Sequence, residues 1–112
     1  LTSCTVGRAR KRRAFFITKP GIGVLTLDIY VETSHSLKDK RHVVKSLKDR
    51  LRERFNLAVA EIDHMDSWQS STVAAVTVAN DRVRAEQILQ AAERHAASVL
   101  GGALTGSNME WI

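Results

Sequence analysis

The chain of 112 residues is long enough for one domain with a single hydrophobic core, and its 44% hydrophobic and 26% charged content is typical of a soluble globular protein. No apolar run approaches the roughly 20 residues that a membrane-spanning helix needs, so we expect no membrane partner. The net charge of +5 favours a polyanion such as nucleic acid as a partner, but this charge is unevenly distributed along the chain.

Residues 1–21 carry the excess positive charge. They contain six of the 17 basic residues and no acidic residue, which leaves eleven basic against twelve acidic residues in 22–112. The segment lacks hydrophobic periodicity and ends at Pro20-Gly21, a pattern typical of a chain that cannot bury enough apolar surface to fold. We interpret 1–21 as a basic, disordered N-terminal extension, either a solvated addition at a mis-assigned start or an RNA-binding arm, and 22–112 as a single domain.

A half-buried strand is predicted over 24–31, where apolar residues occupy every second position. An amphipathic helix is predicted to follow over 36–55. Ser36 suits the N-cap, Asp39 completes an acidic variant of the capping box, and Asn56 suits the left-handed residue that ends a helix. The apolar stripe of this helix consists of Leu37, Val43, Val44, Leu47, Leu51 and Phe55.

Basic side chains are predicted to line one edge of the same helix, and we call this set the basic row. Its members recur at steps of three and four residues and are Lys38, Arg41, Lys45, Lys48 and Arg52. Lys and Arg at this spacing can follow a phosphate backbone without reading base sequence. The alternative is a solvated basic face that has no partner.

Two further strands, a second helix and a last strand complete the prediction. They span 57–62, 72–78, Asn80 or Asp81 to Leu100, and 103–112, with a polar loop at 63–71. The buried stripe of the second helix is Ala85, Ile88, Leu89, Ala92, Ala96, Val99 and Leu100. The order β-α-β-β-α-β predicts an α+β ferredoxin-like sandwich, in which a four-stranded antiparallel sheet carries both helices on one face.

The other face of the sheet is expected to be open. We assign to it Val24, Tyr30, Val59, Val73, Ala75 and Thr77. Because Tyr30 is the only aromatic residue among them, base stacking on the sheet is not expected. The face is apolar enough to form a homodimer or to be covered by another protein.

The sequence shows no catalytic constellation, so we expect neither enzymatic activity nor a cofactor. Glu61, Asp63, His64 and Asp66 cluster in the loop, but no second His or Cys lies at ligand spacing, so we interpret them as a solvated acidic turn rather than a metal site or a hydrolase centre. The single Cys4 cannot form an internal disulfide, and the default location is the cytoplasm.

Trp68 is one of two tryptophans and lies in this polar loop. An exposed indole there would be a binding anchor, whereas an indole folded inward would be a lid over the open end of the core, and we favour the lid. Asp66 and Gln69 are further candidates for contacts from the loop.

Several separated motifs resemble one known family. They are Ser36-Leu37-Lys38-Asp39-Lys40-Arg41, Val44-Lys45-Ser46-Leu47, Arg50-Leu51-Arg52, Phe55-Asn56, Val59-Ala60-Glu61, Asp66 with Trp68-Gln69, Asn80-Asp81-Arg82 and Glu110-Trp111. Over about 22–112 the chain resembles the YlxP-like family, a bacterial domain-of-unknown-function family. The resemblance implies a ferredoxin-like fold and carries over no catalytic residue, because the family has no assigned activity. Its members are often encoded among translation and ribosome-assembly factors, which implies by association a role near the ribosome.

The leading hypothesis is therefore a non-enzymatic cytoplasmic module that binds RNA or a ribonucleoprotein surface through the basic row, with Asp66, Trp68 and Gln69 as additional contacts. The alternative is a homodimerising or protein-interaction module that uses the open face of the sheet.

Overall fold

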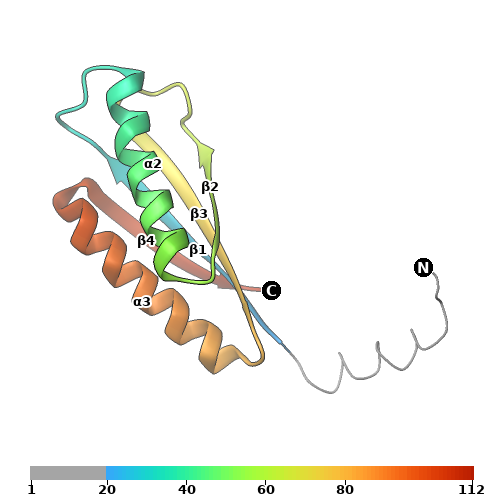
Figure 1. Ribbon diagram of the computed structural model, residues 1–112. Helices are drawn as coiled ribbons and strands as arrows, with labels where there is room; N and C mark the ends of the chain where they lie inside the picture. Colours follow the sequence, from blue (N-terminus) through green and yellow to red (C-terminus); the bar gives the residue numbers. More distant parts are fainter. Residues whose placement is uncertain (1–19) are drawn as a thin grey trace.

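The computed structural model describes residues 20–112, so the predicted extension, apart from Pro20 and Gly21, lies outside the described part of the chain (Figure 1). The elements are β1 (Gly21–Tyr30), α2 (Leu37–Arg54), β2 (Ala58–Asp63), β3 (Ser70–Ala79), α3 (Arg82–Leu100), the short 3-10 helix η1 (Gly101–Ala103) and β4 (Leu104–Trp111). Most bounds lie within three residues of the prediction. The loop between β2 and β3 is shorter than predicted, because β2 ends one residue later and β3 begins two residues earlier.

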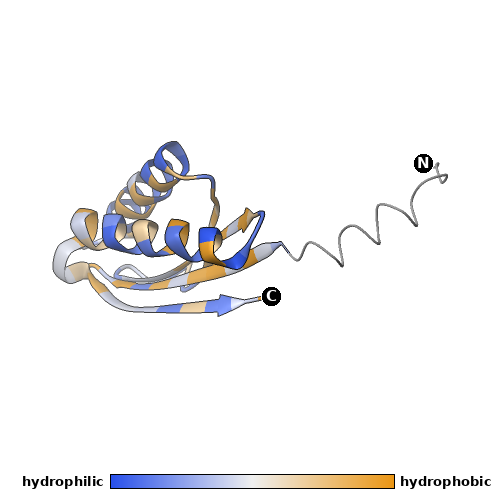
Figure 2. Cartoon of the chain, turned by 90° about the horizontal axis from the view of Figure 1, so that it is seen from below, coloured by the Kyte–Doolittle hydropathy of each residue, from blue (hydrophilic) through white to orange (hydrophobic). Residues whose placement is uncertain are grey.

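The four strands form one antiparallel sheet in the order β2-β3-β1-β4. Both helices cover the same face of this sheet, and the opposite face is open (Figure 2). This is the ferredoxin-like sandwich with β-α-β-β-α-β order that the sequence predicts.

The hydrophobic core lies between the sheet and the two helices. The fully or almost fully buried side chains include Leu25, Leu27 and Ile29 of β1, Val44, Leu47 and Leu51 of α2, and Leu89, Ala92 and Ala96 of α3. The alternation in β1 and the helical spacing in α2 and α3 direct these side chains to one layer, as predicted. The alanines allow α3 to lie close to the sheet.

Two glycines of β1 allow α3 and β4 to approach the strand. A Cβ atom at Gly21 would overlap the carbonyl group of Asp81, the N-cap of α3, and would lie 2.8 Å from Cα of Arg82. A Cβ at Gly23 would lie 2.6 Å from the ring of Trp111. Trp111 thus packs against the core, where Arg82 stacks on its ring 4.7 Å from the centroid.

The assignment of sheet faces was partly wrong. Val59, Val73, Ala75 and Thr77 were expected on the open face, but all four are buried on the helical side. The open face of β3 instead carries Thr72, Ala74, Val76 and Val78. Apolar residues occupy both the odd and the even positions of β3, so the alternation along this strand does not distinguish its two faces.

The end of α2 also differs from the prediction. Phe55 is the C-cap in an extended conformation, and its N–H donates to the carbonyl of Leu51 at 3.0 Å. Asn56 does not take the left-handed conformation, since His64 is the one non-glycine residue with positive φ within 20–112. At the start of α2, Ser36 is the N-cap as predicted, because its hydroxyl accepts from the N–H of Asp39 at 3.1 Å, but the carboxylate of Asp39 accepts from the N–H of His35 at 3.3 Å and not from that of Ser36.

Candidate nucleic-acid interface

The basic row lies along the edge of α2 that faces β2. Arg52 fixes this placement, because its guanidinium donates to the carbonyl of Val59 in β2 at 2.6 Å. Lys38, Arg41, Lys45 and Arg52 are exposed, and Lys48 is half-buried. Four charged side chains of the row are thus accessible to a partner.

Asp49 neutralises part of this positive charge. Its carboxylate accepts a hydrogen bond from Lys45 at 2.9 Å and lies 3.8 Å from the guanidinium of Arg52. The hydrogen bond from Lys45, with the nearby charges of Arg52 and Lys48, outweighs desolvation and holds the pKa of Asp49 below its ordinary value of 3.8. Because these pairs are exposed to solvent, each of them is weak.

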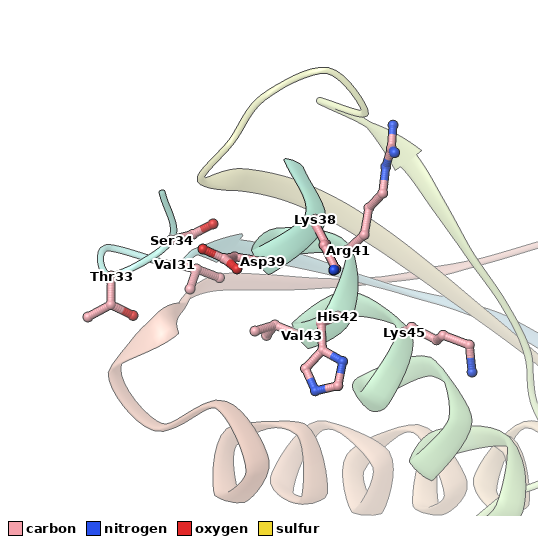
Figure 3. A pocket seen from close by; sticks show the side chains of 9 residues that line it. All are labelled: Val31, Thr33, Ser34, Lys38, Asp39, Arg41, His42, Val43 and Lys45. Carbon is pink, nitrogen blue, oxygen red and sulfur yellow. The ribbon is translucent and has the colours of Figure 1, made fainter. Parts of the chain in front are cut away.

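A hollow of about 490 Å³ opens beside the first two turns of α2 (Figure 3). Three members of the basic row, Lys38, Arg41 and Lys45, line it together with His42, and Val31 and Val43 provide apolar contacts. Asp39 also lines the hollow, so cationic groups and one carboxylate surround a partly apolar surface.

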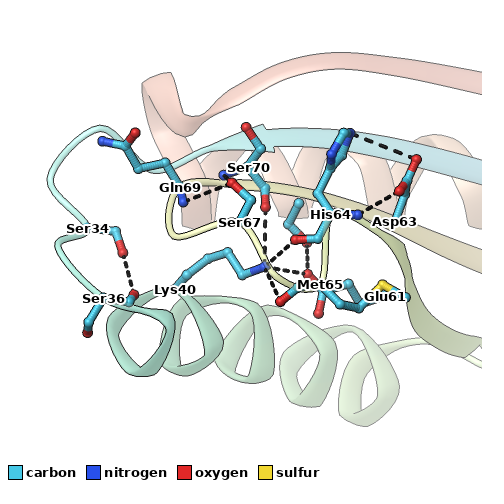
Figure 4. A network of polar contacts seen from close by, with 11 residues as sticks. Ser34, Ser36, Lys40, Glu61, Asp63, His64, Met65, Ser67, Gln69 and Ser70 are labelled. Atoms are coloured by element: carbon cyan, nitrogen blue, oxygen red, sulfur yellow. Dashed lines mark hydrogen bonds and ion pairs between the residues drawn. The ribbon is translucent and has the colours of Figure 1, made fainter.

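Lys40 has a buried position and a set of polar contacts that the sequence analysis did not predict. Its side chain is completely buried and forms an ion pair with Glu61 at 3.1 Å (Figure 4). The ammonium group also donates to the carbonyl of His64 at 2.7 Å and to the carbonyls of Met65 and Ser70 at 3.3 Å each. Lys40 thus ties α2 to both ends of the β2–β3 loop.

The spacing of α2 contained a signal for this role. Leu37, Lys40, Val44, Leu47 and Leu51 follow alternating steps of three and four residues, so Lys40 belongs to the apolar stripe and not to the exposed face. A lysine at such a position is buried only if acceptors surround its charge.

The carboxylate of Glu61 is held by contacts within the protein, as expected for a structural residue and not for a metal ligand. Besides Lys40, its carboxylate accepts a hydrogen bond from the hydroxyl of Ser71 at 2.6 Å. Asp63 accepts from the N–H of His64 at 2.7 Å, and Asp66 is exposed. Across residues 20–112, no group of three or more His, Cys, Asp or Glu side chains is placed to hold a metal ion.

The prediction that Trp68 closes the core as a lid is wrong. Trp68 is 58% exposed, so its indole extends toward solvent from the β2–β3 loop. The buried side chain of Lys40, bonded to Glu61 and to carbonyls of the loop and of Ser70, lies at this end of the domain instead. Gln69, the other predicted contact, is half-buried and bonds to β1 and the segment after it.

Neither helix in the described range is long and apolar enough to cross a membrane.

The fold and this surface define a small α+β protein of the ferredoxin-like class with a basic helix edge. A family model described as "Protein of unknown function (DUF503)" matches residues 22–109, and the chain therefore belongs to this family. The uncharacterized protein YlxP of Bacillus subtilis is 33% identical over 69 residues, which are 62% of this chain and 75% of that protein. The resemblance to the YlxP-like family is thus confirmed.

Two solved structures are similar to the chain in backbone arrangement at low sequence identity. The de novo designed protein Foldit4 is 9% identical, with a TM-score of 0.52 over 84% of this chain and 97% of that chain. A dimeric ferredoxin-like protein of unknown function from Thermobifida fusca is 11% identical, with a TM-score of 0.45 over 82% of this chain and 91% of that chain.

Proposed function

We propose that this protein is a non-enzymatic cytoplasmic module that binds RNA or a ribonucleoprotein surface through the basic row of α2. The observation that carries the proposal is the accessible line of Lys38, Arg41, Lys45 and Arg52 along one helix edge. Outside α2, residues 20–112 hold three basic against nine acidic residues, so within this part of the chain a polyanion is attracted mainly to α2. An association with the ribosome is one setting in which such a module would act.

The side chains of the basic row suit contacts with the phosphate backbone of an RNA and not recognition of its base sequence. Lys45 and Lys48 carry ammonium groups on flexible stems, which contact phosphates as point charges. Arg52 uses part of its guanidinium on the carbonyl of Val59, so it has a structural role as well. Within residues 20–112, Lys45 bonds only to the exposed Asp49 on its own helix, and neither Lys45 nor Lys48 bonds to a strand, so these two positions suit a test better than Arg52.

The test compares two double charge reversals in the full chain. Lys45→Glu with Lys48→Glu alters the row, and Arg84→Glu with Arg94→Glu alters exposed arginines of α3 by the same net charge. We expect the first pair to weaken RNA binding and to reduce the slope of log K against log salt by about 1.4 for a single strand, and the second pair to leave most of the affinity. Equal effects of the two pairs would show that only net charge matters and would contradict the proposal.

A second candidate function is self-association through the open face of the sheet. Val24, Val76 and Ala58 are register partners across three adjacent strands, and they form an apolar strip on this face. Val78 at 57% and Ile62 at 52% exposure add large apolar side chains nearby. An uncovered strip of this kind suits a second copy of the chain.

Sedimentation velocity over a range of protein concentrations tests the second candidate. We expect a dimer that Val76→Lys converts to a monomer, because the substitution places a charge in the middle of the strip. Val83→Lys, at a 68% exposed position of α3, is the control and should leave the dimer intact. A parent protein that stays monomeric at the highest concentration would remove self-association as a function.

A further inference from the structure

Two exposed aromatic side chains, one in the β2–β3 loop and one at the end of β1, lie near each other in the fold through Gln69. Trp68 is 58% exposed, and Tyr30, at the end of β1 on the open face, is 43% exposed. Gln69 connects them, since it follows Trp68 directly and its side-chain oxygen accepts from the hydroxyl of Tyr30 at 3.2 Å. An exposed indole loses the hydrophobic stabilisation of burial, so its position in the loop requires another explanation.

The loop is fixed on both sides of Trp68. On the N-terminal side, Lys40 bonds to the carbonyls of His64 and Met65, and the hydroxyl of Ser67 accepts from the N–H of Gln69 at 3.3 Å. On the C-terminal side, the carbonyl of Gln69 accepts from the N–H of Val31 at 2.9 Å.

Two more bonds complete the support. The N–H of Ser70 donates to the hydroxyl of Ser67 at 3.0 Å, and the side-chain amide of Gln69 donates to the carbonyl of Glu32 at 3.2 Å. The backbone around Trp68 is therefore organised before any partner arrives, which lowers the entropic cost of binding by the indole.

The basic row begins at the same end of the molecule. Lys40 lies between row members Lys38 and Arg41 on α2, and its ammonium group reaches the loop, so the first turns of α2 and the loop are adjacent (Figures 1 and 4). Cationic groups for phosphates and aromatic faces for bases thus occur at the same end of the domain, with the row on the helical side and Tyr30 on the open face. This combination characterises sites for single-stranded nucleic acid.

Building on the proposed function, we infer that the protein prefers single-stranded RNA, whose unpaired bases stack on Trp68 and Tyr30 while the basic row contacts the phosphates. Both polar atoms of the Gln69 side chain are already engaged, so this part of the site stacks bases without reading their edges. A duplex hides its base faces inside the helix and can use only the row.

The experiment measures binding of an unstructured single-stranded RNA and of the duplex made with its complement, at one salt concentration, for the full chain. Trp68→Ala should weaken binding to the single strand by about five- to a hundredfold and change duplex binding by less than about twofold. Trp68→Phe keeps an aromatic face and should restore part of the single-strand affinity. Val83→Ala removes an exposed apolar side chain from α3 and should change neither affinity.

Tryptophan fluorescence gives an independent readout. The single strand should quench the emission of the parent protein, and Trp68→Phe, which retains Trp111, should lose this quenching. Unchanged single-strand affinity in Trp68→Ala overturns the inference. In that case, loss of binding in the Lys45→Glu, Lys48→Glu variant still supports the proposed function, whereas a parent protein that binds neither RNA overturns both.

Discussion

Lys40 is the residue on which the candidate interface depends, although it contacts no partner itself. A buried ammonium group is costly unless acceptors surround it, and here one carboxylate and three carbonyls do so. The result is a loop attached to the helix that carries the basic row. A buried residue of α2 thus fixes the position of the exposed β2–β3 loop.

Replacing Lys40 with Met should lower the free energy of unfolding by about 3 kcal/mol, because Glu61 and the loop carbonyls lose their common donor in a poorly solvated site. Urea denaturation measures this change. Lys38→Met, at an exposed position of the same helix, is the matched control and should change the free energy by less than about 0.5 kcal/mol. Equal free energies of unfolding of the two variants would mean that the network around Lys40 does not stabilise the folded protein.

Sequence reasoning located the basic row but not its support, and the reason is physical. Row members are exposed, so their placement follows from helical periodicity alone. The roles of Lys40 and Trp68 depend on contacts between residues 20 to 40 positions apart in the sequence. Lys40 bonds to His64, and Val31 bonds to Gln69 beside Trp68, and helical periodicity contains no information on such contacts. A lysine within the apolar stripe was the one local signal.

At the scale of elements, local signals predicted most of the fold. Ser36 and Asp81 cap the two helices as expected, and Gly101 ends α3 with a positive φ. The faces of β3 were not predictable in the same way, because apolar residues occupy both parities. Which parity is buried is decided by the register of β3 on β1, where Leu25 pairs with Ala75 and Leu27 with Val73.

The helix α2 should show a specific dependence of stability on pH. The pKa of Asp49 is lowered in the folded protein, so its contribution is complete above the unfolded-state pKa of about 3.9 and is lost as the pH falls through the folded-state value. Asp49→Asn should therefore be slightly less stable than the parent at neutral pH, and the difference should vanish in acid.

Carboxyl NMR titration checks the cause of this dependence. The side chain of Asp49 should titrate below 3.8 in the parent, and Lys45→Met should move its pKa back toward that value, because the hydrogen bond from Lys45 is the largest cause of the shift. A parent carboxyl that titrates at or above 3.8 would contradict the pairing.

The whole molecule separates its charge from its apolar surface. Over 20–112, α2 holds eight of eleven basic residues but three of twelve acidic ones, so the helical layer has a basic edge on a mostly acidic body. The apolar strip lies on the opposite, open face of the sheet (Figure 2). The basic row and the apolar strip lie on opposite sides of the domain, so a second copy on the strip would leave the row exposed, whereas Tyr30 of the proposed stacking site shares the open face with the strip.

The net charge of the chain conceals this arrangement, because the six basic residues of 1–21 outweigh the slightly acidic remainder.

If the basic row is the binding surface, its effect on RNA affinity should persist without the charge of the extension. Substituting Gln for all six basic residues of the extension, Arg8, Arg10, Lys11, Arg12, Arg13 and Lys19, should lower RNA affinity by reducing counterion release. In that background, Lys45→Glu with Lys48→Glu should still reduce the salt slope by about 1.4, since separate phosphate contacts contribute independently. Fluorescence anisotropy over a salt series measures both slopes. If the reversal has no effect once the extension is neutral, the extension and not α2 binds the RNA.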